Sequence, residues 1–383
     1  MLLQLTQTHQ QLQETAREFA DKILIPSADR CDRAEEYPAE NVAKLAELGF
    51  LGILIPEQFG GAGLDNVALS LALEEINRGC ASTGVTLSVH NSLLSNPLLN
   101  FGTPEQHERY LPKLASGEWL GAYAITEPDH GSDAASIETS CRREGDEYIL
   151  NGTKAWITNG SHAGVIITFA TLDPSLGPKG VCAFVIESTF PGFQVGKKEK
   201  KLGIRGSDTV QLVFDEMRVP AANLLGEEGE GFKIAMHTLD GGRIGIATQA
   251  VGIAQACLDA TVAFAGTKTQ FGRPLPASQL VAHRVADMAT EIEAARLLVM
   301  RAAMLKDAGL PHGKEASMAK LYASELANRC ARTAVEIHGG AALGRGAPVE
   351  RLLRDAKITE IYEGTSEIQR LVISRHCFPR DKK

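Results

Sequence analysis

Glu363 is the strongest candidate for acid–base chemistry in the chain because of the residues that flank it. It lies in the stretch 361–369, IYEGTSEIQ. The spacing of Ser366 and Gln369 predicts a capping box and a helix that begins there. Glu363 would precede the helix N-terminus, whose dipole favours a carboxylate, with the flexible Gly364 after it. A charged carboxylate on a hinge suits a general base, although surface glutamates at helix starts are common.

Two further segments carry groups that could bind a phosphate or a flat polar ring. Residues 123–133, YAITEPDHGSD, run from a strand-like start into a turn rich in N–H and hydroxyl groups. Ordinary surface loops have the same composition. Trp156 and Thr158 alternate along a predicted strand and therefore point to one side, where they could pack on a heterocycle. The alternative is that Trp156 fills a core.

Two glycine pairs interrupt or end helical patterns. The pair in 240–243, DGGR, costs about 1 kcal/mol per glycine relative to alanine, which suggests close approach of a ligand or another backbone. A tight helix–helix contact is the other interpretation. In 337–340, IHGG, the first glycine is a routine C-cap, and the second could let a cofactor approach the backbone. His338 could be a base, but a histidine at a helix end is more often a capping cation.

The pattern of helical and strand segments along the sequence predicts an α+β chain of three domains, which must position these residues. Residues 1–120 read as mostly helical, 121–225 as a middle β-barrel domain and 226–383 as helical again. Predicted strands lie at 147–150, 153–158, 165–169, 181–186 and 210–214, and long helical stretches lie at 230–265, 278–307 and 314–337. Asn151 and Gly152 predict a hairpin turn between the first two strands.

Helix starts are predicted in the N-terminal region from capping patterns. Thr8 with Gln11 predicts one start, and Thr103 with Pro104 and Gln106 predicts another. Leu12, Ala16, Phe19 and Ile23 share one face at helical spacing, and the glycine-rich stretch 60–63 predicts a loop.

Composition excludes several classes of function. The 383 residues carry a net charge of -8, which argues against nucleic acid as a partner. Seven scattered cysteines without a CxxC pair argue against a zinc site or a disulfide framework. No signal or transit peptide is visible, and we expect no membrane span, so a cytoplasmic location of bacterial type is predicted.

Taken together in this order, the segments resemble the acyl-CoA dehydrogenase family over nearly the whole chain. The telling stretches are 124–133, 155–160, 202–209, 271–274, 339–340 and 354–369. The sequences at 240–247 and 358–368 are most similar to short-chain (butyryl-CoA) members. The resemblance implies an N-terminal α-helical domain, a middle β domain and a C-terminal four-helix bundle.

The resemblance also implies the chemistry. It implies FAD, an acyl-CoA substrate, a trans-2-enoyl-CoA product and electron-transfer flavoprotein as electron acceptor. Glu363 matches the family's base, which removes the α-proton while a hydride leaves the β-carbon for flavin N5. The family stabilises the thioester oxygen with the backbone N–H of this glutamate and a flavin hydroxyl. Gly242 occupies the position where some branched-chain members carry the base, so one candidate base remains.

Other residues match family binding positions one by one. The resemblance implies cofactor contacts at Tyr123, Ile125, Thr126, Ser132, Trp156, Ile157, Thr158, Lys268, Gln279, Gly339, Gly340, Thr365 and Glu367. It implies substrate contacts at Ser132, Asp240, Arg243, Tyr362 and Gly364, and no metal. Some FAD contacts cross a subunit boundary, which implies a homotetramer built as a dimer of dimers. The chain departs from the family at Lys268, usually arginine, and at Ala342, usually glycine.

The resemblance leaves alternatives open. A sibling enzyme would act on a short branched acyl-CoA, and residues 90–94 either line the acyl pocket or form plain core. Flavin monooxygenases and binding or assembly factors share the fold. Glu363 argues against both, because a monooxygenase needs no α-proton base.

Overall fold

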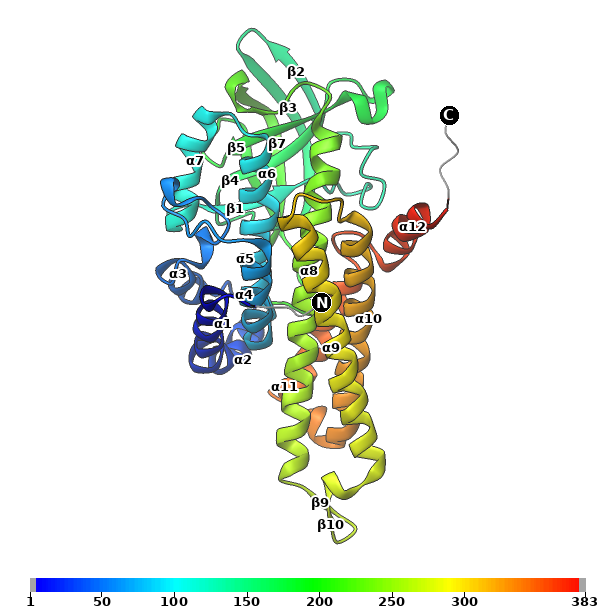
Figure 1. The fold of residues 1–383 in the computed structure, drawn as a ribbon. Helices are drawn as coiled ribbons and strands as arrows, with labels where there is room; N and C mark the ends of the chain where they lie inside the picture. The colour runs from blue at the N-terminus through cyan, green and yellow to red at the C-terminus, as the bar shows by residue number, and fades with distance from the viewer. Residues whose placement is uncertain (1–4, 379–383) are drawn as a thin grey trace.

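The computed structural model describes residues 5–378 and confirms the predicted α+β order of helices, sheet and helices. Figure 1 shows the N-terminal helices beside the bundle of C-terminal helices, with the sheet at one end of that bundle. The hairpin of β9 (Thr269–Gln270) and β10 (Arg273–Pro274) lies at the other end.

The N-terminal part is helical. Its elements are α1 (Gln7–Phe19), η1 (Ala20–Leu24), α2 (Ile25–Ala34), α3 (Ala39–Glu47), η2 (Phe50–Gly52), η3 (Glu57–Phe59), α4 (Asn66–Gly79), α5 (Ala81–Ser88), η4 (Val89–Ser95), α6 (Asn96–Phe101) and α7 (Pro104–Ser116). Thr6 caps α1, so the start predicted at Thr8 is two residues too late. The capping box of Thr103 and Gln106 at α7 is confirmed.

The middle part is one sheet of eight strands in the order β6-β7-β3-β2-β4-β5-β8, with β1 parallel to β4. The strands are β1 (Leu120–Ala124), β2 (Ser140–Glu144), β3 (Glu147–Thr158), β4 (Ala163–Thr171), β5 (Val181–Glu187), β6 (Phe193–Lys198), β7 (Thr209–Pro220) and β8 (Leu224–Leu225). The strands predicted at 165–169, 181–186 and 210–214 lie within β4, β5 and β7.

The hairpin turn predicted at Asn151 and Gly152 is wrong, because β3 runs unbroken through both residues. Gly152 lies at a register shift between β3 and β7, and Asn151 exchanges hydrogen bonds with Glu216 of β7. The turn comes earlier, at Gly145 between β2 and β3, where φ is 63°. The asparagine–glycine pair therefore marks a bulge.

The C-terminal part is a bundle of long helices. Its elements are α8 (Gly231–Gly266), α9 (Gln279–Asp307), α10 (Gly313–His338), α11 (Pro348–Lys357) and α12 (Ser366–Cys377). The three predicted helical stretches match α8, α9 and α10. Gly252 brings α8 against α4, since a Cβ there would lie 2.5 Å from the Glu74 carbonyl oxygen.

Helix α8 is the element that bears on the expected absence of a membrane span. Among the described residues it is the one helix long and apolar enough to cross a membrane by composition, with a mean hydropathy of 1.2 over its most apolar window. However, 61% of that window is buried inside the protein. The helix packs against α4, α9 and α10, so protein side chains cover its apolar surface.

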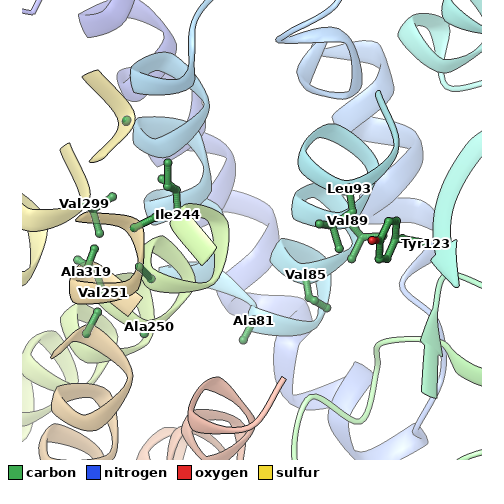
Figure 2. Packing of buried hydrophobic residues seen from close by; sticks show 14 of the residues in the cluster. Ala81, Val85, Val89, Leu93, Tyr123, Ile244, Ala250, Val251, Val299 and Ala319 are labelled. Carbon is green, nitrogen blue, oxygen red and sulfur yellow. The ribbon is translucent and has the colours of Figure 1, made fainter. Parts of the chain in front are cut away.

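One apolar cluster joins all three parts. In Figure 2, Ala81, Val85, Val89 and Leu93 form a stripe, and its last members lie beside Tyr123 of β1. Full burial of each larger apolar side chain stabilises the fold by about 1.5–3 kcal/mol. The stripe ends in η4, a π-helical segment of the kind that often occurs at functional sites.

Candidate active site

The turn that carries Glu363 has a conformation that most residues avoid. Glu363 and Gly364 have φ angles of 51° and 93°, in the left-handed region. The Gly364 carbonyl accepts hydrogen bonds from Lys320 Nζ at 2.6 Å and Gln369 Nε2 at 2.9 Å. Gln369 also donates to the Glu363 carbonyl at 3.2 Å. Side chains from α10 and α12 therefore fix the turn.

The start of α12 differs from the sequence expectation by one residue. Thr365 is the N-cap, and its hydroxyl accepts the Ile368 N–H at 3.4 Å. The predicted capping box of Ser366 and Gln369 is wrong, because the Gln369 amide binds the Glu363 turn instead. Glu363 still lies just before the helix N-terminus.

One oxygen of the Glu363 carboxyl is buried without a hydrogen-bond partner in the described chain. The residue is half-buried as a whole, but Oε2 is buried and has no hydrogen-bond partner within residues 5–378. Burial raises the pKa of Glu363 to about 7, and the cations of Lys320 and Arg243 oppose this rise. A carboxyl of this kind exchanges a proton near neutral pH.

Gly242 on α8 makes room for that carboxyl. A Cβ atom at Gly242 would lie 2.2 Å from Glu363 Oε2 and 2.7 Å from Leu93 Cδ2. A Cβ atom at Gly241 would lie 2.5 Å from Lys306 Nζ. Both glycines therefore allow close approach of another segment, as the sequence suggested.

Apolar and aromatic groups surround the carboxyl. Leu93 Cδ2 approaches the same point next to Gly242 that Glu363 Oε2 approaches. The buried Tyr123 hydroxyl has no hydrogen-bond partner in the described chain. Burial and the Glu363 charge together raise the pKa of Tyr123. The Tyr362 hydroxyl donates to Gln249 Oε1 on α8, about 10 Å along the helix from Gly242 at 1.5 Å per residue.

Arg243 and Asp240 connect this turn to an open cleft. The buried Arg243 pairs with Asp240, and Ser317 Oγ accepts a second hydrogen bond from it at 3.5 Å. Asp240 lines a cleft of about 780 Å³ between α6, α8, α12 and the connection from α9 to α10. The basic side chains on its walls are His237, Lys306, His312 and His376.

The ends of β1 and β3 are tied together by a buried ion pair. Lys154 is fully buried and donates to Glu127 at 2.6 Å and to the Ile125 carbonyl at 3.3 Å. The Ala155 N–H donates to the Thr126 carbonyl at 2.8 Å. Residues 125–127 and 154–158, which both carry predicted cofactor contacts, therefore lie side by side.

Trp156 is open to solvent at this edge. Its side chain is 58% exposed, Thr158 is half-buried, and Ile157 between them is buried. Trp156 also has a φ of 61°, beside a register shift between β3 and β7. The alternative that Trp156 fills a core is wrong. That Trp156 and Thr158 share one side of the strand stays a prediction.

Sequence comparison decides the family. Residues 6–118, 122–217 and 229–378 match the N-terminal, middle and C-terminal domains of acyl-CoA dehydrogenases. The mitochondrial short-chain specific acyl-CoA dehydrogenase of Bos taurus is 52% identical over 374 residues, covering 98% of this chain and 91% of that protein. The chain belongs to the acyl-CoA dehydrogenase family.

Solved structures agree with this family. Butyryl-CoA dehydrogenase from Megasphaera elsdenii matches this acyl-CoA dehydrogenase with a TM-score of 0.97 and 44% identity, over 98% of this chain and all of that one. A chain in a structure of the electron transferring flavoprotein of Acidaminococcus fermentans matches with a TM-score of 0.98 and 46% identity, over 99% and 100% of the two chains. As a family member, the protein is an FAD-dependent oxidoreductase that acts on acyl-CoA.

The sheet edge of this acyl-CoA dehydrogenase fits a flavin. The exposed Trp156 ring offers an apolar face, and the hydroxyl-bearing residues Thr126 and Thr158 lie on the two paired segments next to it in the chain fold. Ser132 lies in the exposed loop that follows β1, where hydroxyl and N–H groups suit a phosphate.

Four predicted cofactor residues belong to the other end of the bundle. Lys268 lies next to β9, Gln279 begins α9, and Gly339 and Gly340 follow α10. Lys268 Nζ lies 5.1 Å from the Phe264 ring centroid, and Phe264 in turn stacks on His338. One chain therefore does not bring this set to Trp156 and Glu363. Thr365 and Glu367, in contrast, lie at the start of α12 beside Glu363.

The two departures from the family have different surroundings. Lys268 is exposed, so its ammonium is free to meet a ligand or a second chain. Ala342 is 1% exposed and part of the apolar core, where its methyl group is accommodated.

Sequence reasoning missed two residues of the site, Lys320 and Gln249. Both are fully buried polar residues on core faces of helices. A signal existed for Lys320, because it falls in register with Ala316, Ala323 and Ala327 on the buried face of α10. A lysine on an alanine-lined core face is unusual enough to mark a functional group.

Proposed function

We propose that this chain oxidises short-chain acyl-CoA thioesters to trans-2-enoyl-CoA, with Glu363 as the base that removes the α-proton. The observation that carries the proposal is the Glu363 carboxyl, which has a pKa of about 7 and a buried Oε2 without a hydrogen-bond partner in the described part of the chain. FAD, when bound, supplies the acceptor for the hydride that leaves the β-carbon.

The chain's own groups favour proton removal. Above pH 7 the carboxylate is available, and its apolar surroundings exclude the water that would otherwise weaken it as a base. The Glu363 backbone N–H donates to no backbone acceptor among the described residues. A free N–H beside the base suits the thioester oxygen, which gains negative charge as the proton leaves.

A short acyl chain is supported by the elements around the base. Leu93 of η4 approaches the carboxyl from one side, and the Tyr362–Gln249 hydrogen bond ties the Glu363 turn to α8. A long acyl chain along α8 would meet this bond and have to break it, leaving buried polar groups without partners.

The CoA part has a suitable place in the cleft next to Asp240. Arg243 and Asp240 lie between the Glu363 turn and this cleft, so a thioester at Glu363 would extend past both. Lys306 and three histidines on its walls suit the phosphates of CoA, although Asp65, Asp240 and Asp307 also line the cleft and oppose an anion. Ser132 is proposed as a further contact to the CoA or flavin phosphates.

The test is an anaerobic titration of the FAD-loaded protein with butyryl-CoA, isobutyryl-CoA and octanoyl-CoA. We expect butyryl-CoA to bleach the flavin band fastest. Glu363→Gln should keep FAD and bind butyryl-CoA while the bleaching rate falls by about 10²–10⁴-fold, the usual contribution of a general base. Fast bleaching by the variant would reject Glu363 as the base. Bleaching by isobutyryl-CoA alone would replace the substrate.

Electron-transfer flavoprotein is the proposed electron acceptor, and a homotetramer the proposed assembly. The acceptor is supported by the similar chain in the Acidaminococcus fermentans flavoprotein structure. Mixing butyryl-CoA-reduced protein with electron-transfer flavoprotein should reoxidise the flavin much faster than air does. Equal rates would point to an oxidase or oxygenase.

A further inference from the structure

Lys320 is a buried cation in the wall of the site. It lies in the middle of α10, none of its surface is exposed, and its Nζ donates to the Gly364 carbonyl at 2.6 Å. Gln369 donates to the same carbonyl at 2.9 Å. The carbonyl would thus keep a hydrogen-bond donor without Lys320, so the turn alone does not explain why a charge is buried here.

The second buried cation of the site has its own counter-ion. Arg243 pairs with Asp240, and its charge is largely balanced there. Lys320 makes no ion pair within 4.0 Å among residues 5–378, and Glu363 is the carboxylate that acts on it most strongly. Lys320 is also the cation that lowers the pKa of Glu363 most, ahead of Arg243.

The remaining charged groups around this pair are few. Burial lowers the pKa of Lys320 to about 8, and Glu363 opposes this shift most strongly. Arg243, then Glu360 on η9 (Ile358–Glu360) and Glu367 on α12, affect the pKa of Lys320 less than Glu363 does. Tyr123 from β1 and Tyr362 face Glu363 as neutral phenols, since burial raises the pKa of each. Lys320 is therefore the one cation facing Glu363 in the described chain whose charge no adjacent carboxylate balances.

We propose that Lys320 is the positioning residue of the base: it holds the Gly364 carbonyl and supplies positive charge that favours the carboxylate form of Glu363 before the substrate arrives. This inference rests on the proposed function of Glu363. Lys320 does not touch the reacting atoms and acts through Glu363 alone.

The experiment compares Lys320→Met, which removes the charge, with Lys320→Arg, which retains it. The rate of flavin reduction is measured from pH 6 to pH 9 with butyryl-CoA well below saturation, so that it reports the free enzyme. Loss of a nearby cation raises the pKa of a carboxyl, so the rising limb of Lys320→Met should move upward by about one pH unit. At pH 6.5 flavin reduction in this variant should be about tenfold slower than in the wild type at the same pH. The rate should recover toward the wild-type value as the pH approaches 9. Lys320→Arg should keep the wild-type limb.

Infrared spectroscopy gives a second measurement that does not depend on turnover. A protonated carboxyl band that disappears between pH 6 and pH 9, and that Glu363→Gln lacks, reports Glu363 directly. In Lys320→Met this band should persist to higher pH. Lys44→Met is the matched control, because Lys44 is exposed on α3. It should change neither the limb nor the band.

Each outcome decides a separate point. A uniform loss of rate in Lys320→Met with the wild-type limb and band would overturn the inference and leave a structural role. If Lys320→Met does not retain FAD, Lys320→Gln replaces it under the same criterion. If Glu363→Gln itself reduces flavin rapidly, the proposed function fails. If Glu363→Gln is inactive and the Lys320→Met limb is unmoved, only the role of Lys320 fails.

Discussion

Glu363 is a residue whose reactivity conflicts with stability. Its pKa is raised from 4.5 in the unfolded chain to about 7 in the folded protein, so ionisation costs the folded state. The contribution of the protonated Glu363 carboxyl to the free energy of unfolding is fully present below pH 4.5 and is lost as the pH rises through about 7. Active-site groups commonly destabilise the fold in this way.

Glu363→Gln should therefore stabilise the protein at pH 8 but not at pH 4.5. The glutamine does not titrate, so the difference in free energy of unfolding should grow between these pH values by about 3 kcal/mol. Denaturant unfolding of both proteins at several pH values measures it. A difference that is independent of pH would contradict the raised pKa.

The rate of flavin reduction in the wild-type protein should follow the same ionisation. The carboxylate is the active form, so the rate with butyryl-CoA should rise with pH, with a midpoint of about 7 in the free enzyme. Stopped-flow kinetics at low substrate concentration reports this midpoint. A midpoint near 4.5 would mean that the carboxyl is exposed to water.

Gly242→Ala should impair catalysis without unfolding the protein. Its Cβ would lie 2.2 Å from Glu363 Oε2, and displacing the base by about 1 Å can cost 10²-fold in rate. Gly241→Ala is the matched control, because its Cβ meets only the flexible end of Lys306. We expect a far smaller loss for the control. Equal losses would show that helix geometry, not the position of the base, controls the rate.

At the scale of elements, the buried Lys154–Glu127 pair joins the two segments of the flavin edge. Burial lowers the pKa of Lys154 to about 8, while Glu127 opposes this shift. Lys154→Met leaves Glu127 buried without its cation and should destabilise the protein by about 3 kcal/mol. The double variant Glu127→Gln with Lys154→Met should recover much of this loss. Thermal unfolding and FAD content measure both effects, and no recovery would mean that the pair contributes no mutual stabilisation.

Long elements were predictable from the sequence, whereas their ends and one turn were not. The periodicity of α8, α9 and α10 extends over many residues, so it survives local exceptions. The turn at Asn151 failed because β7 pairs with both halves of β3, and this tertiary pairing overrides the local turn preference. The cap of α12 failed because Gln369 binds the Glu363 turn, a contact that spacing alone does not reveal.

The candidate site was predictable where short motifs carry it. Glu363, Trp156 and the glycine at position 242 stand in distinctive local sequences. Lys320 and Gln249 were missed because they contribute only after α8 and α10 pack together, across many residues of chain. A single sequence holds no direct record of such contacts.

At the scale of the whole molecule, the predicted FAD contacts fall into two sets at opposite ends of the bundle. If a second chain completes each flavin site, Trp156→Ala and Gln279→Ala should each lose FAD as pure proteins. A randomly mixed assembly of the two should recover about a quarter of the sites, because half of the symmetric dimers are hybrids with one intact site of two. FAD content after unfolding and refolding together measures this. No recovery would place the whole site within one chain.

The separation of α4 and α8 along the chain sets how long an apolar face of α4 stays uncovered during synthesis. The α4 face that α8 covers is complete at Gly79, while α8 begins at Gly231. At about 5–20 residues per second, the ribosome needs roughly 8–30 s to make the intervening chain. During this interval the nascent N-terminal helices present an uncovered apolar face, which makes the half-made polypeptide a natural client for chaperones.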